Sequence, residues 1–371
     1  MKRFVIILFT LIICFPLTVQ ASEYSEYIDS FDLSSFNELD GDTKDLLEEL
    51  GLDEFDYENI TNISLSSVLK YIANIFTNKA QGPIKSGVTV IAFILLSSLF
   101  KSFGFQLQRG DSAEFLDTIT NLIISVFLAV RLTDCIGLCC STIKLCADFT
   151  YAFFPAFCII VSASGGAMTS FSVNTTLLIL AQGLNLISSN FFVPLTNCFL
   201  ALGICSSIRK DLHLGGIISS LRNIITTLIS SLSAIFVSIL SVKTAVASRA
   251  DVLGLRSVRF AINSVVPVIG SSISEGLLSI QSYSSLIKTS VGVVGIIAVC
   301  AVFLPAIAEA AMWRLMLSVA DMCSQIFSNG SGCSSVKVFK DALLIVNVIL
   351  ILSMVTTIIS IGILVAAKTV N

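Results

Sequence analysis

The sequence predicts an all-α fold, a polytopic helical membrane protein with about seven transmembrane helices plus re-entrant or interfacial segments. Apolar residues make up 55% of the chain and charged residues only 13%, against roughly 25% charged residues in ordinary soluble domains. The mean hydropathy of +0.92 over 371 residues is too high for one water-soluble core with a polar skin. Apolar segments near the roughly 20 residues that a bilayer requires recur from residue 86 onward.

The first 21 residues have the pattern of a secretory signal peptide. Lys2 and Arg3 form a positive start, and an apolar run follows over residues 4–14. Small residues at Val19 and Ala21 have the spacing of a cleavage site. The signal places the following residues outside the cytoplasm, and an uncleaved first helix is the alternative.

Residues 22–83 are predicted to form a small acidic helical module outside the cytoplasm. Residues 22–80 contain fourteen acidic residues against three lysines. Apolar residues recur at helical spacing over 43–51 and 64–76, which predicts two amphipathic helices. A pair this small buries little surface alone. It is therefore expected either to dock on a partner or the membrane, or to serve as a solvated spacer.

Residues 84–371 are predicted to form the polytopic membrane domain. With the N-terminus outside, the first span places Lys101 and Arg109 in the cytoplasm, as the positive-inside rule prefers. The predicted spans are 86–103, 115–138, 146–164, 172–189, 190–207, 288–308 and 341–367.

A basic stretch after residue 242 is predicted to be a cytoplasmic loop that fixes how the flanking helices thread. Its cations are Lys243, Arg249, Arg256 and Arg259. The segment 223–242 before it is long enough to cross, but a crossing would place these cations outside. We therefore predict that 223–242 is re-entrant or interfacial.

The segment 260–282 is a second candidate for partial insertion. It contains Pro267 and Gly270 within an otherwise apolar run. A helix break of this kind is tolerated at membrane depth only where protein or a water-lined cavity satisfies the backbone. Pro155 and Pro305 also interrupt hydrophobic segments; such breaks point to a transport path, although proline is also simply common in membrane helices.

Four charged residues in or beside the apolar segments are candidate pore-lining or packing residues. Arg131 and Asp134 lie three apart, so they share a helix face and can pair. Intramembrane charges mark functional sites by default, but we favour the explanation that the two form a self-neutralised pair near the outer interface. Glu309 follows Pro305, and Arg314 is near enough to compensate its charge.

Small residues recur in the predicted span 288–308. Gly292 and Gly295 are followed by alanines at the same three-residue spacing. Small side chains on neighbouring positions let another helix approach closely, so this pattern predicts a packed bundle or oligomer.

The motifs of several enzyme classes are missing from the sequence. It has no G-x-x-x-x-G-K-[ST] phosphate loop, and His213 is its one histidine. The cluster Cys135, Cys139, Cys140 and Cys146 matches no common zinc spacing, and its members are read as small apolar residues inside helices. We therefore expect no catalytic residue, cofactor, metal or nucleic-acid partner, and a protein that is not an enzyme.

Two segments carry a resemblance to a known family. The run SRADVLGLRSVRFAINSVVPVIGSSISEG at 248–276 and the run SLIKTSVGVVGIIAVCAVFLPAIAEAAMWRL at 285–315 resemble the stage III sporulation protein AE family of endospore-forming bacteria. The signal, the acidic module and the multi-span remainder fit the same pattern.

This resemblance implies a membrane subunit of the channel or secretion apparatus that links mother cell and forespore. One version of this role is the permease-like part of that apparatus. The implied location is the mother-cell membrane around the engulfed forespore, the outer forespore membrane. The implied partners are ring-forming proteins, a separate ATPase and a forespore membrane partner. The implied role is to sustain late forespore gene expression and forespore integrity. The alternative is a stand-alone proton- or ion-coupled secondary transporter, suggested by the prolines and Glu309.

Overall fold

The computed structural model describes residues 65–106, 110–186, 214–265, 270–327 and 334–367, besides a few isolated positions between 194 and 205. The signal peptide and most of the acidic module lie outside these ranges. All contacts given below lie within the compact unit Tyr71–Asn371.

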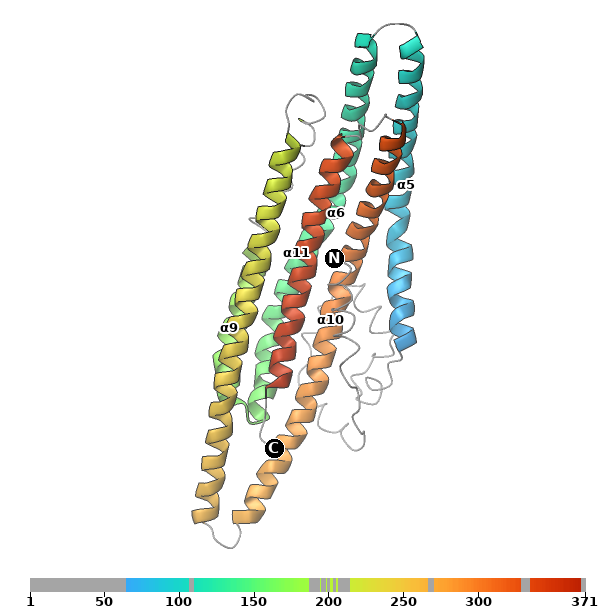
Figure 1. Cartoon of the computed structure of the whole chain (residues 1–371). Helices are drawn as coiled ribbons and strands as arrows, with labels where there is room; N and C mark the ends of the chain where they lie inside the picture. Colours follow the sequence, from blue (N-terminus) through green and yellow to red (C-terminus); the bar gives the residue numbers. More distant parts are fainter. Residues whose placement is uncertain are drawn as a thin grey trace. The chain divides into compact units, whose positions relative to one another are not determined.

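The described part of the chain is all-helical, which confirms the predicted fold class. In Figure 1, α10 lies next to α11, and α9, which packs against α7 and α11, lies along one margin of the view. Their bounds are α5 Leu65–Gln106, α6 Gly110–Ala163, α7 Ala167–Leu186, α9 Leu214–Val265, α10 Gly270–Phe327 and α11 Ser334–Ala366.

Five of these helices are long and apolar enough to cross a membrane, which indicates a membrane protein. The candidate spans are Asn74–Leu99, Thr118–Ala163, Asn223–Ile262, Leu278–Phe327 and Ser335–Ala366. The longest has 50 residues, which is about 75 Å of helix at 1.5 Å per residue. A hydrocarbon core is only about 30 Å thick, so the apolar length of these helices exceeds what one crossing requires.

The prediction of separate spans over 115–138 and 146–164 is wrong, because α6 runs through both without a break. The residues between them, Cys139 to Leu145, include no glycine or proline that would end a helix. The prediction assumed about 20 residues for each span, and it therefore divided this one long helix into two. The predicted span 172–189 overlaps α7, whose apolar part Ala167–Leu180 is shorter than a span; most of 190–207 lies outside the described residues.

Of the two predicted forms of 223–242, the re-entrant one is wrong, because α9 continues through this segment to Val265. The interfacial form stays a prediction. The hydroxyl groups of this segment bond to the helix backbone one turn earlier. Ser230 Oγ donates to the carbonyl of Thr226 at 2.7 Å, and Ser238 Oγ to that of Ala234 at 2.8 Å. Serine in this role needs no other partner, so a serine-rich segment stays helical in an apolar setting.

Prolines do not end the helices that contain them. Pro83, Pro155 and Pro305 lie inside α5, α6 and α10 respectively. The prediction that Pro155 and Pro305 interrupt their segments is therefore wrong at the level of secondary structure, because α6 and α10 continue through them. Membrane helices tolerate proline in this way. The helix predicted over 64–76 is likewise only the start of α5, which passes the predicted domain boundary at Pro83.

A tight turn joins α6 to α7 and is held by backbone hydrogen bonds. The amides of Gly165 and Gly166 donate to the carbonyls of Ser162 and Val161, each at 3.0 Å. Gly165 has a φ of 92°, a left-handed conformation that suits glycine at the end of a helix. A Cβ on Gly165 would lie 2.9 Å from Leu255 Cδ1 and 3.4 Å from Gln281 Cδ, so the turn packs against both α9 and α10.

Candidate functional site: buried polar contacts between helices

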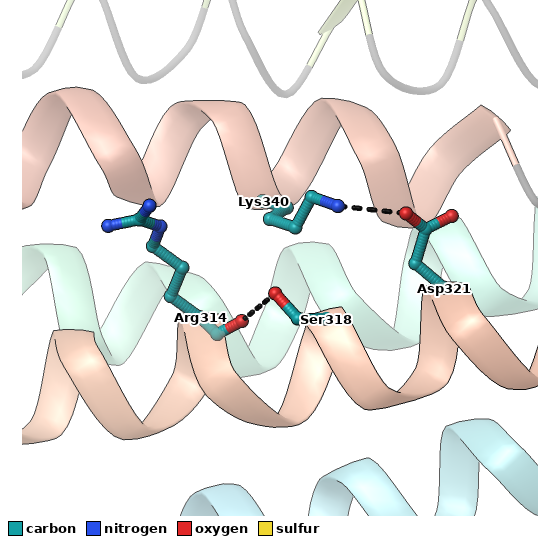
Figure 2. A network of polar contacts seen from close by, with 4 residues as sticks. All are labelled: Arg314, Ser318, Asp321 and Lys340. Atoms are coloured by element: carbon teal, nitrogen blue, oxygen red, sulfur yellow. Dashed lines mark hydrogen bonds and ion pairs between the residues drawn. The ribbon is translucent and has the colours of Figure 1, made fainter.

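An ion pair joins α10 to α11 (Figure 2). Lys340 Nζ donates to Asp321 Oδ2 at 2.8 Å, and the side chains are 28% and 7% exposed respectively. Arg314 and Ser318 lie on the same face of α10, and Ser318 Oγ donates to the Arg314 carbonyl at 2.9 Å. Because a charge buried alone is far more costly than a paired one, this contact fixes how the two helices pair.

The carboxylate of Asp251, on α9, binds the N-terminus of α7. Its Oδ1 accepts from the Met168 amide at 2.7 Å, and its Oδ2 from the Thr169 amide at 2.9 Å and the Thr169 hydroxyl at 2.6 Å. These amides belong to the first turn of α7, where no intrahelical acceptor is available. The positive end of the helix dipole adds to the attraction, so a residue more than 80 positions away caps α7.

Two lysines make further polar contacts between helices. Lys243 Nζ, on α9, donates to Thr176 Oγ1 of α7 at 3.1 Å. Lys288, which is only 2% exposed on α10, donates from Nζ to the carbonyl of Ala367 at 2.9 Å. That carbonyl directly follows α11, so a positive charge lies at the negative end of the helix dipole.

Arg131 and Asp134 form no ion pair with each other, although the structure describes both. Both side chains are exposed on α6, and the Arg131 guanidinium lies over the Phe127 ring with 6.0 Å between them. The predicted pairing is therefore wrong. Stacking on an aromatic ring of its own helix gives the arginine another favourable contact.

Glu309 is half-buried on α10 and lies within the electrostatic range of two other helices. The charges that act on its carboxyl group are those of Lys79 on α5 and Asp134 on α6. Lys79 is a residue that the sequence did not suggest as a neighbour of Glu309. Arg314, predicted to compensate Glu309, lies in the network of Figure 2.

Gly292 and Gly295 lie where α10 closely approaches α11 and α6. A Cβ on Gly292 would come within 2.2 Å of Val365 Cγ2 on α11, and one on Gly295 within 2.5 Å of the Phe153 ring on α6. The Phe153 ring stacks on those of Phe149 and Phe157. Small residues at these two positions make room for an aromatic ladder.

The predicted basic loop is helical. Lys243, Arg249, Arg256 and Arg259 all lie inside α9, not in a connection between helices. The segment contains no proline before Pro267, and its one glycine, Gly254, is tolerated inside the helix. Pro267 itself lies outside the described residues. The predicted loop is thus wrong as structure, and the compartment that these cations face stays a prediction. Gly270 is the first residue of α10.

Sequence reasoning did not select Asp251, Lys288, Asp321 or Lys340 as site residues. A signal existed for one pair, because Asp321 and Lys340 lie at similar distances from the connection between α10 and α11. An antiparallel hairpin brings such positions level. No comparable signal links Asp251 to the start of α7.

Comparison with known proteins decides the family. The family model described as stage III sporulation protein AE matches residues 52–368, a range that includes every helix above. This chain belongs to that family. Stage III sporulation protein AE of Bacillus subtilis (strain 168) is 23% identical to it over 220 residues, which are 59% of this chain and 55% of that relative. The match thus spans about half the length of the relative, and no solved structure matches.

Proposed function

We propose that this sporulation-family protein is a non-enzymatic membrane subunit of the apparatus that connects mother cell and forespore, and acts as its permease-like part. Its place would be the mother-cell membrane around the forespore. The observation that carries the proposal is the family match over residues 52–368, which coincides with the apolar helical region.

The buried charges support a role in assembly and passage more than a role in chemistry. Asp251, Lys288 and the pair Asp321–Lys340 each bind a neighbouring helix. Polar contacts of this kind hold membrane helices in a fixed arrangement, since lipid provides no hydrophobic force between them. Because the sequence has no G-x-x-x-x-G-K-[ST] phosphate loop, we assign ATP hydrolysis to a separate subunit. Ring-forming proteins and a forespore membrane protein would be its other partners.

The test is a deletion in the native spore-forming host, with a reporter for late forespore transcription. We expect the deletion to abolish late reporter activity after engulfment, and the wild-type chain to restore it. Gly137→Ala provides a matched complementation control, because nothing lies within 4 Å of a Cβ at that position. Normal sporulation with full late transcription in the deletion strain would refute the proposal.

A stand-alone secondary transporter is the second candidate, favoured by one observation. Glu309 lies half-buried among long apolar helices with the charges of Lys79 and Asp134 acting on it, and intramembrane carboxylates serve as proton or ion relays in transporters. This candidate predicts ion-coupled uptake by the purified protein in liposomes, lost in Glu309→Gln. Absence of uptake by the wild-type protein alone, together with a sporulation defect, would reject it.

A further inference from the structure

The outer face of α9 has a regular row of apolar side chains that do not pack against the described helices. Large apolar side chains that are 48–65% exposed recur there at alternating steps of four and three residues. This is the heptad spacing of helices that wrap around a partner helix. The positions are Leu228, Leu232, Ile235, Ile239, Val242 and Val246.

The same spacing continues toward the end of α9. Leu253 and Phe260 are exposed at the next apolar positions of the heptad, and Arg249 and Arg256 occupy the two positions between. We call the whole set, from Leu228 to Phe260, the outer stripe. Leu240, Thr244, Ala247 and Asp251 are buried on the opposite side of α9, so the outer stripe points away from the bundle, at whose margin α9 lies in Figure 1.

The outer stripe is longer than the hydrocarbon core of a bilayer. Its 32 residue steps correspond to about 48 Å of helix, whereas the hydrocarbon core is about 30 Å thick. Even at a tilt of about 40°, the upper end of the observed range, the stripe still spans about 37 Å along the membrane normal. The unbroken apolar part, Leu228 to Val246, is about 27 Å long, which the hydrocarbon can cover. Leu253 and Phe260, which alternate with the two arginines, extend past the hydrocarbon, where lipid tails do not cover them.

A row of small residues flanks the outer stripe on one side. Ser231, Ala234, Ser238, Ser241 and Ala245 are all exposed and repeat at the same steps of three and four. Small residues beside an apolar seam let a partner helix approach closely.

The two arginines of the outer stripe indicate the charge that a partner helix would carry. Arg249 and Arg256 are exposed one heptad apart, and neither forms an ion pair with a carboxylate that the structure describes. A partner with carboxylates at the same heptad spacing would neutralise both. Two parallel copies of α9 would instead set arginine against arginine. Among the described side chains, the exposed carboxylates Asp134, Asp148 and Glu275 include no pair seven residues apart on one helix.

We propose that the outer stripe of α9 is the docking surface for a transmembrane helix of a different subunit, one that carries an apolar heptad and carboxylates facing Arg249 and Arg256. The assignment rests on the proposed function, because it requires that the protein works in a multi-subunit apparatus. It adds which helix binds the partner and what chemistry the partner presents.

The experiment places a photo-cross-linking amino acid, p-benzoylphenylalanine, at single positions of the full chain in sporulating cells. Ile239 and Val246 are the test positions. Ser230 and Val258 are matched controls, since both are exposed on α9 away from the stripe. We expect one discrete protein adduct from the test positions, identified by mass spectrometry, and at least tenfold less from the controls.

Charge exchange then separates docking from chance proximity. The double variant Arg249→Glu/Arg256→Glu, normalised to the amount of chain in the membrane, is expected to lower the adduct at least tenfold. Replacement of the facing carboxylates of the identified subunit by lysine is expected to restore it, and Arg249→Lys/Arg256→Lys to keep it.

Four outcomes would overturn the proposal: adducts with lipid only at all four positions, an adduct between two copies of this chain, no effect of charge reversal, or no rescue by the exchange. The proposed function fails separately, by unchanged late forespore transcription in the deletion strain. A missing adduct beside a clear deletion phenotype therefore rejects only the docking surface.

Discussion

Asp251 is expected to hold the α6–α7 hairpin against α9, and its removal should release that hairpin. Asp251→Ala deletes the acceptor of two amide donors and one hydroxyl donor. A hydrogen bond to a charged group contributes about 1.5–3 kcal/mol, and an anion at a helix N-terminus up to about 2 kcal/mol. Because water re-solvates part of the exposed helix end, we expect the free energy that holds the hairpin against α9 to fall by about 2–4 kcal/mol. Asp251→Asn keeps one acceptor oxygen and should lose about half of this.

The assay is the reactivity of Cys158 toward a maleimide, followed by mass spectrometry of the labelled peptide. Cys158 is buried near the end of α6, and its carbonyl accepts a hydrogen bond from Ser170 of α7 at 2.7 Å. At 1.4 kcal/mol for each factor of ten, the expected loss corresponds to labelling about 30- to 700-fold faster.

Asp148→Ala is the matched control for this prediction, because it removes an exposed carboxylate from α6. Labelling of Cys158 in Asp251→Ala at the rate of this control would contradict the prediction. It would show that the contact at the start of α7 does not hold the hairpin.

Three further predictions concern contacts of α10. Asp321→Leu or Lys340→Met alone should lower the free energy of unfolding by about 3–5 kcal/mol, measured with denaturant in mixed micelles, because each leaves a buried charge without its partner. The double variant should return to within about 1 kcal/mol of the wild type. Equal losses in all three variants would contradict this prediction. Gly295→Leu should destabilise by about 1–3 kcal/mol or more, because it drives a side chain into an aromatic ring of α6, while Gly137→Leu, with open space around it, should cost less than about 0.5 kcal/mol. Lys288→Met should lower stability by about 1 kcal/mol and speed hydrogen exchange in the last turn of α11; unchanged exchange there would argue against a cap.

Composition and hydropathy were sufficient to predict the fold class. Lipid offers no hydrogen-bond partners to the backbone, so a long apolar segment satisfies its backbone groups by forming a helix. The number of spans could not be obtained in the same way. Nothing in the residues between Cys139 and Leu145 distinguishes a helix that continues from one that ends at the membrane surface. The same ambiguity made the serine-rich start of α9 look re-entrant.

The candidate site was predictable only where its geometry is local. Gly292 and Gly295 carry their own signal, because small residues at a three-residue spacing imply close approach on one helix face. In the sequence, Asp251 is one charge within a charged run. The group that it binds is the first turn of α7, 83 residues earlier. Only tertiary structure brings those two segments together.

The most direct test of the account is complementation of the deletion from one compartment at a time. Expression of the chain in the mother cell alone is expected to restore late forespore transcription fully, and expression in the forespore alone is expected to restore none. Rescue by forespore expression would contradict the assignment to the mother-cell membrane, and late transcription in the uncomplemented deletion would contradict the proposed function itself.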